Sequence, residues 1–219
     1  MKKLFLTATV LALCFASCKN ENKEIETETT MAADTTAIAT DSIEMTEEPM
    51  DSVAMQKAWE AYMTPGEPHQ MLADEVGTWT NDMTFWMEPN GEPSKATSNA
   101  DIKMILGGRY QETTYTGDMM GMPFEGRATV AYDNAADEFI STWIDNMGTG
   151  MMIMRGKYDE GSKSMTMTGS IVDPMTGKEK QMREVYTIVD ENTRKMEFFD
   201  QAPGGGEYKS MEFVMKRKM

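Results

Sequence analysis

Cysteine and histidine are nearly missing from this sequence, and their scarcity excludes several kinds of chemistry. The two cysteines, Cys14 and Cys18, both lie in an apolar N-terminal stretch, and His69 is the one histidine. A zinc site draws several ligands from cysteine and histidine, and a catalytic triad needs a histidine inside the site. Beyond residue 18, disulfides, thiolate metal sites and cysteine nucleophiles are therefore excluded together.

Positive charge is also in short supply. The chain carries 21 Lys and Arg against 36 Asp and Glu, a formal net charge of -15. Nucleic-acid binding needs a basic stripe that displaces the counterions of the phosphates, and the sequence has none. We therefore expect no nucleic-acid partner, and we interpret the acidity as a contribution to solubility.

The N-terminus reads "MKKLFLTATVLALCFASCKN". Two lysines precede an apolar stretch, residues 4–15, that is too short to remain as a membrane span. Small residues at 16 and 17 then precede Cys18, the arrangement of a bacterial lipoprotein signal. This predicts a signal peptide over residues 1–17 and lipidation of Cys18, because Leu13 is too large for cleavage before Cys14. An ordinary secretory signal is the alternative.

Residues 18–51 are rich in Glu, Asp, Thr and Ala and poor in aromatics. Such a segment buries too little apolar area to offset chain entropy, so we expect a disordered acidic tether. Lys19 is not an inner-membrane retention aspartate, and "KNENKE" resembles the surface-export tethers of Bacteroidetes lipoproteins. We expect an outer-membrane lipoprotein of the cell envelope, held by its acyl chains. The periplasmic and surface faces both remain open.

The remaining chain divides at about residue 77. Residues 52–76 carry apolar side chains at helical spacing, interrupted by Pro65 and Gly66, and predict a short helical segment. Residues 77–219 alternate short strand-like segments with nine turn signals such as "EPNGEP" and "APGGGE". In "GEYKSMEFVMKRKM", Met211, Phe213 and Met215 share one face, as expected for a sheet with one solvated side.

This pattern predicts an all-β fold, an antiparallel up-and-down β-barrel of about ten strands. A barrel of that size is wider than the eight-strand minimum, so an interior cavity is expected. A short helix followed by Gly-x-Trp in "VGTW" resembles the opening of the lipocalins and their calycin relatives. That resemblance implies that Trp79 closes one barrel end and that Arg217, on the last strand, packs over it.

Candidate ligand contacts come from aromatic and basic side chains on the predicted strands. An inward arginine in a fatty-acid-type barrel binds a carboxylate through two hydrogen bonds. Arg127 and Arg183 either point inward in this way or form surface pairs. The candidate ligand-binding residues are Trp86, Tyr115, Arg127, Trp143 and Arg183. Among the carboxylates, Glu184 and Glu197 lie on adjacent predicted strands, but the sequence does not show whether the two side chains face each other. We expect no catalytic residue.

Methionine is abundant, with 25 in the chain, and three lie in "TGDMMGMPFEG". Thioethers suit Cu(I), yet methionine also fills irregular cores and lines adaptable apolar surfaces. Many methionines here stand on alternating apolar faces, so core or pocket lining is favoured. A haem-binding barrel of the nitrobindin type would need an axial histidine on the barrel, and His69 precedes it. We therefore expect no metal and no cofactor.

The stretch "GGRYQETTYTGDMMGMPFEGRATVAYDNAADEFISTWIDNMGTG", with "DPMTGK" and "APGGGEYKSMEF" after it, resembles the bacterial domain-of-unknown-function family numbered 1579. The resemblance covers about residues 69–217. It implies a calycin-like fold and brings no reaction or functional residues. It also implies that "MMGMPFEG" belongs to the family's scaffold.

The leading functional hypothesis is non-catalytic binding of a small apolar or amphipathic molecule inside the barrel. One alternative is an envelope interaction module whose barrel is filled by side chains. Another is an enzyme that acts on an envelope lipid or glycan.

Overall fold

The structure, a computed structural model, describes residues 51–202 and 204–219. The predicted signal peptide, Cys18 and nearly all of the predicted tether lie outside the described residues. Ten antiparallel strands form one closed barrel in which sequence neighbours pair and the first strand pairs with the last. The elements are α1 (Ser52–Met63), α2 (Glu67–Ala73), β1 (Gly77–Phe85), β2 (Ser94–Ile105), β3 (Tyr110–Met119), β4 (Met122–Asp133), β5 (Glu138–Asp145), β6 (Met152–Asp159), β7 (Ser164–Val172), β8 (Glu179–Asp190), β9 (Thr193–Gln201) and β10 (Glu207–Arg217). The predicted ten-strand up-and-down barrel after a helical segment is confirmed.

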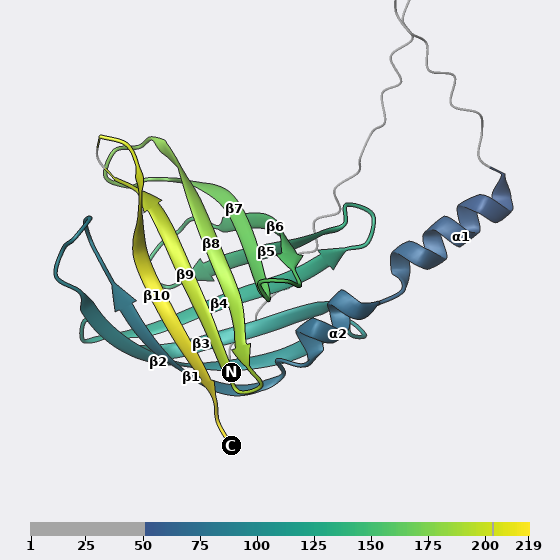
Figure 1. Ribbon diagram of the computed structural model, residues 1–219, viewed down its shortest axis with the longest axis horizontal. Coiled ribbons are helices and arrows are strands. Elements are labelled where there is room, and N and C mark those ends of the chain that lie inside the picture. The colour runs from purple at the N-terminus through teal and green to yellow at the C-terminus, as the bar shows by residue number, and fades with distance from the viewer. Residues whose placement is uncertain (1–50, 203) are drawn as a thin grey trace, which may run out of the picture. The chain divides into compact units, whose positions relative to one another are not determined.

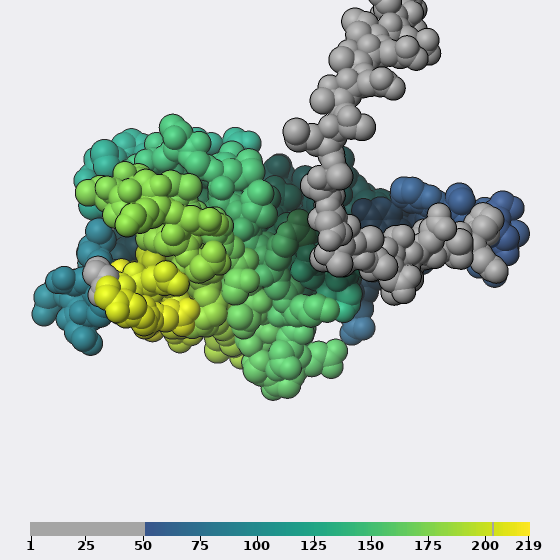
Figure 2. All heavy atoms as spheres, turned by 90° about the horizontal axis from the view of Figure 1, so that it is seen from above, coloured from purple at the N-terminus to yellow at the C-terminus, as the bar shows by residue number. Residues whose placement is uncertain are grey.

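The turns alternate between the two ends of the barrel, because each connects neighbouring antiparallel strands. The turns β1–β2, β3–β4, β5–β6, β7–β8 and β9–β10 share one end, which we call the mouth. In Figure 2 the blue β1–β2 turn and the yellow β9–β10 turn lie together at this end. We call the other end the base, and there α2 packs against β2, β3 and β4 (Figure 1).

Strand alternation places one set of side chains inside the barrel. On β1, Trp79, Asn81 and Met83 are buried, while Thr80 and Asp82 between them are exposed. The buried apolar residues form two clusters, and full burial of a Leu, Ile, Phe or Met side chain contributes about 1.5–3 kcal/mol to stability. The first cluster is Trp79, Ala100, Ile102, Tyr115, Phe124 and Met215, and the second is Leu72, Phe139, Met154, Met165, Met167 and Phe198.

The two helices begin with different caps. Asp51 caps α1, its carboxylate accepting from the Ala54 N–H at 2.8 Å. At the start of α2 the His69 Nδ1 atom accepts from the Gly66 N–H at 3.1 Å. His69 is buried against the edge of the Tyr132 ring, and burial followed by the charge of Arg109 lowers its pKa. This histidine therefore stabilises a helix start and does not line the barrel interior.

The helix α1 buries none of its side chains. It is joined to the base at its C-terminal end, where the Asn134 side chain donates to the carbonyl groups of Tyr62 and Thr64 at 3.0 and 2.9 Å. Neither helix in the described part of the chain has the length and apolar composition needed to cross a bilayer.

Candidate functional site

The barrel contains a cavity of about 920 Å³. Leu72 and Glu75 border it at the base, while residues 147–151 of the β5–β6 turn and Pro174 of the β7–β8 turn border it at the mouth. Ligand pockets in proteins have volumes of roughly 300 to 1,000 Å³, so this cavity has the size of a small-molecule site. Strand alternation creates it, since the inward side chains of ten strands leave the centre unfilled.

Apolar side chains form most of the cavity lining. Eleven methionines contribute to it, together with aromatic residues such as Phe85, Phe198 and Phe213. Unbranched thioether side chains adapt their shape to a bound molecule at low cost, which suits a pocket more than a rigid core. Among the described residues, no group of three histidine, cysteine or acidic side chains lies close enough to hold a metal ion.

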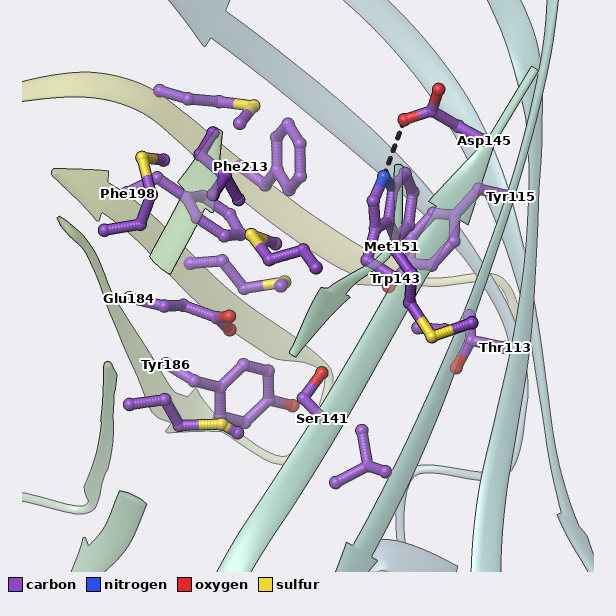
Figure 3. A pocket seen from close by; sticks show the side chains of 18 of the residues that line it. Thr113, Tyr115, Ser141, Trp143, Asp145, Met151, Glu184, Tyr186, Phe198 and Phe213 are labelled. Carbon is purple, nitrogen blue, oxygen red and sulfur yellow. Dashed lines mark hydrogen bonds between the residues drawn. The ribbon is translucent and has the colours of Figure 1, made fainter. Parts of the chain in front are cut away.

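Glu184 places a carboxyl group in this apolar lining. It follows Met182 and precedes Tyr186 on the inward face of β8, and its side chain is directed into the cavity (Figure 3). The residue is only 6% exposed, and its carboxylate has no hydrogen-bond or ion-pair partner among the described residues. Burial raises the pKa of Glu184 to about 7, because the charged form loses its hydration.

Tyr115 and Trp143 form an aromatic wall across the cavity (Figure 3). Their ring centroids are 5.2 Å apart in an edge-on arrangement, and the indole N–H of Trp143 donates to Asp145 at 2.7 Å. Burial, together with the charges of Glu184 and Glu75, raises the pKa of Tyr115 far above its ordinary value. Tyr115 therefore presents a neutral hydroxyl to the cavity at physiological pH.

At the base, a second carboxylate has two partners. The Glu75 carboxylate accepts from the Arg194 Nε–H at 2.8 Å and from the Tyr186 hydroxyl. Arg194 and Glu75 are both buried, and Arg194 also donates to the backbone carbonyl of Thr193 at 3.1 Å. The two buried carboxyl groups thus differ: Glu75 is held by a cation and a phenol, whereas Glu184 has neither.

The structure places three of the candidate ligand residues outside the cavity lining. Arg127 is exposed beside Glu125, with 3.3 Å between the charged groups. Arg183 donates to Glu207 at 2.9 Å and lies 3.8 Å above the Phe199 ring. Trp86 lies under Lys209, whose ammonium is 5.2 Å from the ring. The reason is strand alternation, since each follows an inward residue: Gly126, Met182 and Phe85.

The remaining candidates lie on the inward face. Tyr115 and Trp143 line the cavity, while Trp79 is completely buried and its indole N–H donates to the Glu75 carbonyl at 2.9 Å. The Arg217 guanidinium lies 4.3 Å above the Trp79 ring and donates to the Val76 carbonyl at 2.7 Å. Trp79 and Arg217 therefore stand together at the base, where a barrel-closing role remains a prediction.

Sequence reasoning missed the polar groups that distinguish this interior. It did not place Glu184 in the cavity, and it overlooked the cluster of Glu75, Tyr186 and Arg194. Met182 and Tyr186, two residues either side of Glu184, carry a usable signal, because residues two apart on a strand share a face. The cluster has no comparable signal, since Glu75 is far from the other two in the sequence.

The fold and the site together define a class: a closed up-and-down β-barrel whose apolar internal cavity holds, among the described residues, one buried carboxyl group without a partner. The chain belongs to the DUF1579 family, described as "Protein of unknown function", whose sequence model matches residues 64–217. A comparison with curated proteins gives no match.

Solved structures provide two similar barrels. Rv2717c from M. tuberculosis is 16% identical and has a TM-score of 0.53, covering 71% of this chain and 100% of its own. The S-type phycobiliprotein lyase CPES from Guillardia theta is 8% identical and has a TM-score of 0.49, covering 70% and 94%. The likeness to Rv2717c shows the fold.

Proposed function

We propose that this protein binds a small, largely apolar molecule inside its barrel. The observation that carries the proposal is the cavity of about 920 Å³ with its methionine and aromatic lining. Apolar surface in water is unfavourable, so a ligand that replaces water in this space gains free energy from every buried carbon.

The cavity favours binding over the alternative of a filled barrel that serves only as an interaction module. In a filled barrel, inward side chains meet at the centre and leave few voids larger than a water molecule. Here the inward positions leave a space many times larger. The polar groups on the lining are few, which is the usual composition of a site that holds a small molecule.

Native mass spectrometry and titration with the neutral dye Nile red test this proposal. We expect the full chain to carry a small-molecule mass or to bind the dye. Ala128→Trp should abolish binding, because Ala128 lines the cavity and an indole there occupies the ligand's space. Thr129→Trp adds the same group at the next position of β4, on the outer face, and should bind normally. A wild-type protein that carries no mass and binds no dye would overturn the proposal.

For the cellular location, we propose a cell-envelope protein that is anchored to the outer membrane by lipid at Cys18. The support is the sequence "MKKLFLTATVLALCFASCKN". A barrel that binds an apolar molecule gains from a membrane anchor, because such molecules partition into bilayers. A clickable fatty acid supplied to bacteria should label the wild-type chain and not Cys18→Ser, and equal labelling of both would overturn the anchor.

A further inference from the structure

We infer that the ligand of this cavity is an amphiphile with a protonated amine, and that the Glu184 carboxylate binds that amine. The inference rests on the proposed binding function and specifies its ligand class. Glu184 is the one carboxyl group at mid-strand among the described lining residues, and it points into the cavity without a partner from those residues (Figure 3).

The described residues that line the cavity around Glu184 include no basic group. Its neighbours across the sheet are Met167 on β7 and Phe198 on β9, both buried. The other titratable side chains of the lining are Glu75, Tyr115, Asp145, Glu179 and Tyr186, and none of the described lining residues is lysine, arginine or histidine. Glu75 is neutralised by Arg194, so the cavity presents a net negative potential to a ligand.

A buried carboxylate without a partner is costly, because it loses hydration and gains no replacement. An ammonium group offers N–H donors and the opposite charge, and the low dielectric of the barrel interior strengthens their attraction. A ligand carboxylate has the reverse effect, since two negative charges would meet in the same apolar space. The same lining therefore attracts amines and rejects anions.

The position of the arginines supports this choice. A barrel that binds fatty acids needs an inward cation for the ligand's carboxylate. Arg127 and Arg183 instead form ion pairs on the outer surface, with Glu125 and Glu207. The buried Arg194 is already occupied by Glu75 and by backbone carbonyl groups. The described residues that line the cavity therefore offer no cation to an anionic ligand.

Three probes with one chain length and different head groups test the inference: dodecylamine, dodecanol and dodecanoate. Each displaces Nile red from the full-length protein at pH 8, where Glu184 is ionised. We expect the amine to bind at least about tenfold more tightly than the carboxylate, with the alcohol between them. Equal or tighter binding of dodecanoate overturns the inference, while binding of the dye still supports the proposed function.

Glu184→Gln separates the carboxylate from the rest of the lining. The amide keeps the size of the side chain and removes its charge, so amine affinity should fall about tenfold while dodecanol affinity is unchanged. The matched control is Glu160→Gln, which removes one negative charge from the exposed β6–β7 turn at the base and should leave all three affinities unchanged. An amine affinity unaffected by Glu184→Gln overturns the inference.

The pH dependence supplies an independent readout. Alkylamines stay protonated between pH 6 and 8, whereas the ionised fraction of Glu184 rises through its pKa of about 7. Amine affinity should therefore rise about tenfold from pH 6 to pH 8 in the wild type and stay flat in Glu184→Gln. If none of the three probes and no dye binds at any pH, the proposed function fails, and the inference fails with it.

Discussion

At the base of the barrel, buried polar side chains and backbone groups are tied to one another, whereas at the mouth the turns carry exposed methionines and glycines. Arg217 joins the last strand to the carbonyl groups of Val76 and Asp74, and Arg194 joins β9 to Glu75. Between them lies Trp79, with Arg194 and Arg217 on its ring at 5.3 and 4.3 Å. The segment before β1 is thereby fixed to the strands that close the barrel.

The mouth has no comparable cluster among the described residues. Four of its five turns carry a strongly exposed methionine: Met87, Met120, Met151 and Met175. The β3–β4 turn of "TGDMMGMPFEG" is a tight hairpin in which Met120 and Gly121 adopt φ of 55° and 79°, and the Asp118 carboxylate accepts from the Gly121 N–H at 2.8 Å. These four turns present apolar side chains to solvent.

This contrast indicates that the two ends of the barrel differ in how firmly they hold the chain. Local opening of a protein starts where few buried contacts hold the chain, so the mouth is expected to open more readily than the base. A ligand that enters the cavity would pass the methionine-bearing turns, while the base keeps the barrel closed. Three experiments break or sharpen this comparison.

The largest effect is expected from Arg194→Met at the base. The change leaves the Glu75 carboxylate buried without its cation, and breaking a buried pair in this way costs about 3–5 kcal/mol. Urea unfolding should show this loss. The control is Arg155→Met on the outer surface, where the pair with Glu138 is solvent-exposed and its loss should cost less than about 1 kcal/mol. Equal losses for the two variants would remove the distinction between base and surface.

A second comparison uses one residue type in two places. Met167 is 2% exposed in the cluster that reaches α2 through Leu72, whereas Met175 in the β7–β8 turn is 90% exposed. Truncation of a buried methionine to alanine costs about 2–5 kcal/mol, while a surface change stays within about 0.5 kcal/mol. Thermal unfolding of Met167→Ala and Met175→Ala measures the two losses of stability. If Met175→Ala loses as much stability as Met167→Ala, the turns at the mouth are held as tightly as the barrel interior.

The smallest effect comes from Glu184 in the ligand-free protein. Its folded-state pKa of about 7 lies above the unfolded value of 4.5, so the wild-type protein loses stability as pH rises between these values. Glu184→Gln does not titrate and should gain roughly 2–3 kcal/mol relative to the wild type between pH 5 and pH 8. Unfolding curves at both pH values measure this difference, and a constant difference would mean that Glu184 is hydrated in the cavity.

The barrel itself was predictable from the sequence, and the reason is visible on β10. Met211, Phe213 and Met215 alternate with Ser210 and Glu212, and the regular turn signals between such segments leave few other topologies. The Gly-x-Trp opening also led to the prediction that Arg217 packs over Trp79. These patterns involve residues that are close in the sequence, so they can be recognised without knowledge of the tertiary structure.

The candidate site was less predictable because β8 does not alternate clearly. Val185 and Val189 on its outer face are as apolar as Met182 on its inner face, so the face that Met182 and Tyr186 share with Glu184 was only a weak signal of the inward direction. Tyr115 and Trp143, large aromatic residues on predicted strands, line the cavity, and their contact with a ligand stays a prediction. The cluster of Glu75, Tyr186 and Arg194 joins positions more than 110 residues apart, and no local spacing records such a contact.

The exposed methionines also allow the mouth to be probed by methionine oxidation. Thioethers in contact with water are converted to sulfoxides by mild peroxide, whereas buried ones react slowly. Met120 and Met175 should therefore be oxidised before Met154 and Met167, which are 1% and 2% exposed. Met151 lines the cavity and is also 59% exposed, so a ligand that covers it will slow its oxidation relative to Met175. The ratio of these two sulfoxides reports cavity occupancy directly in cells, without a label or a purified ligand.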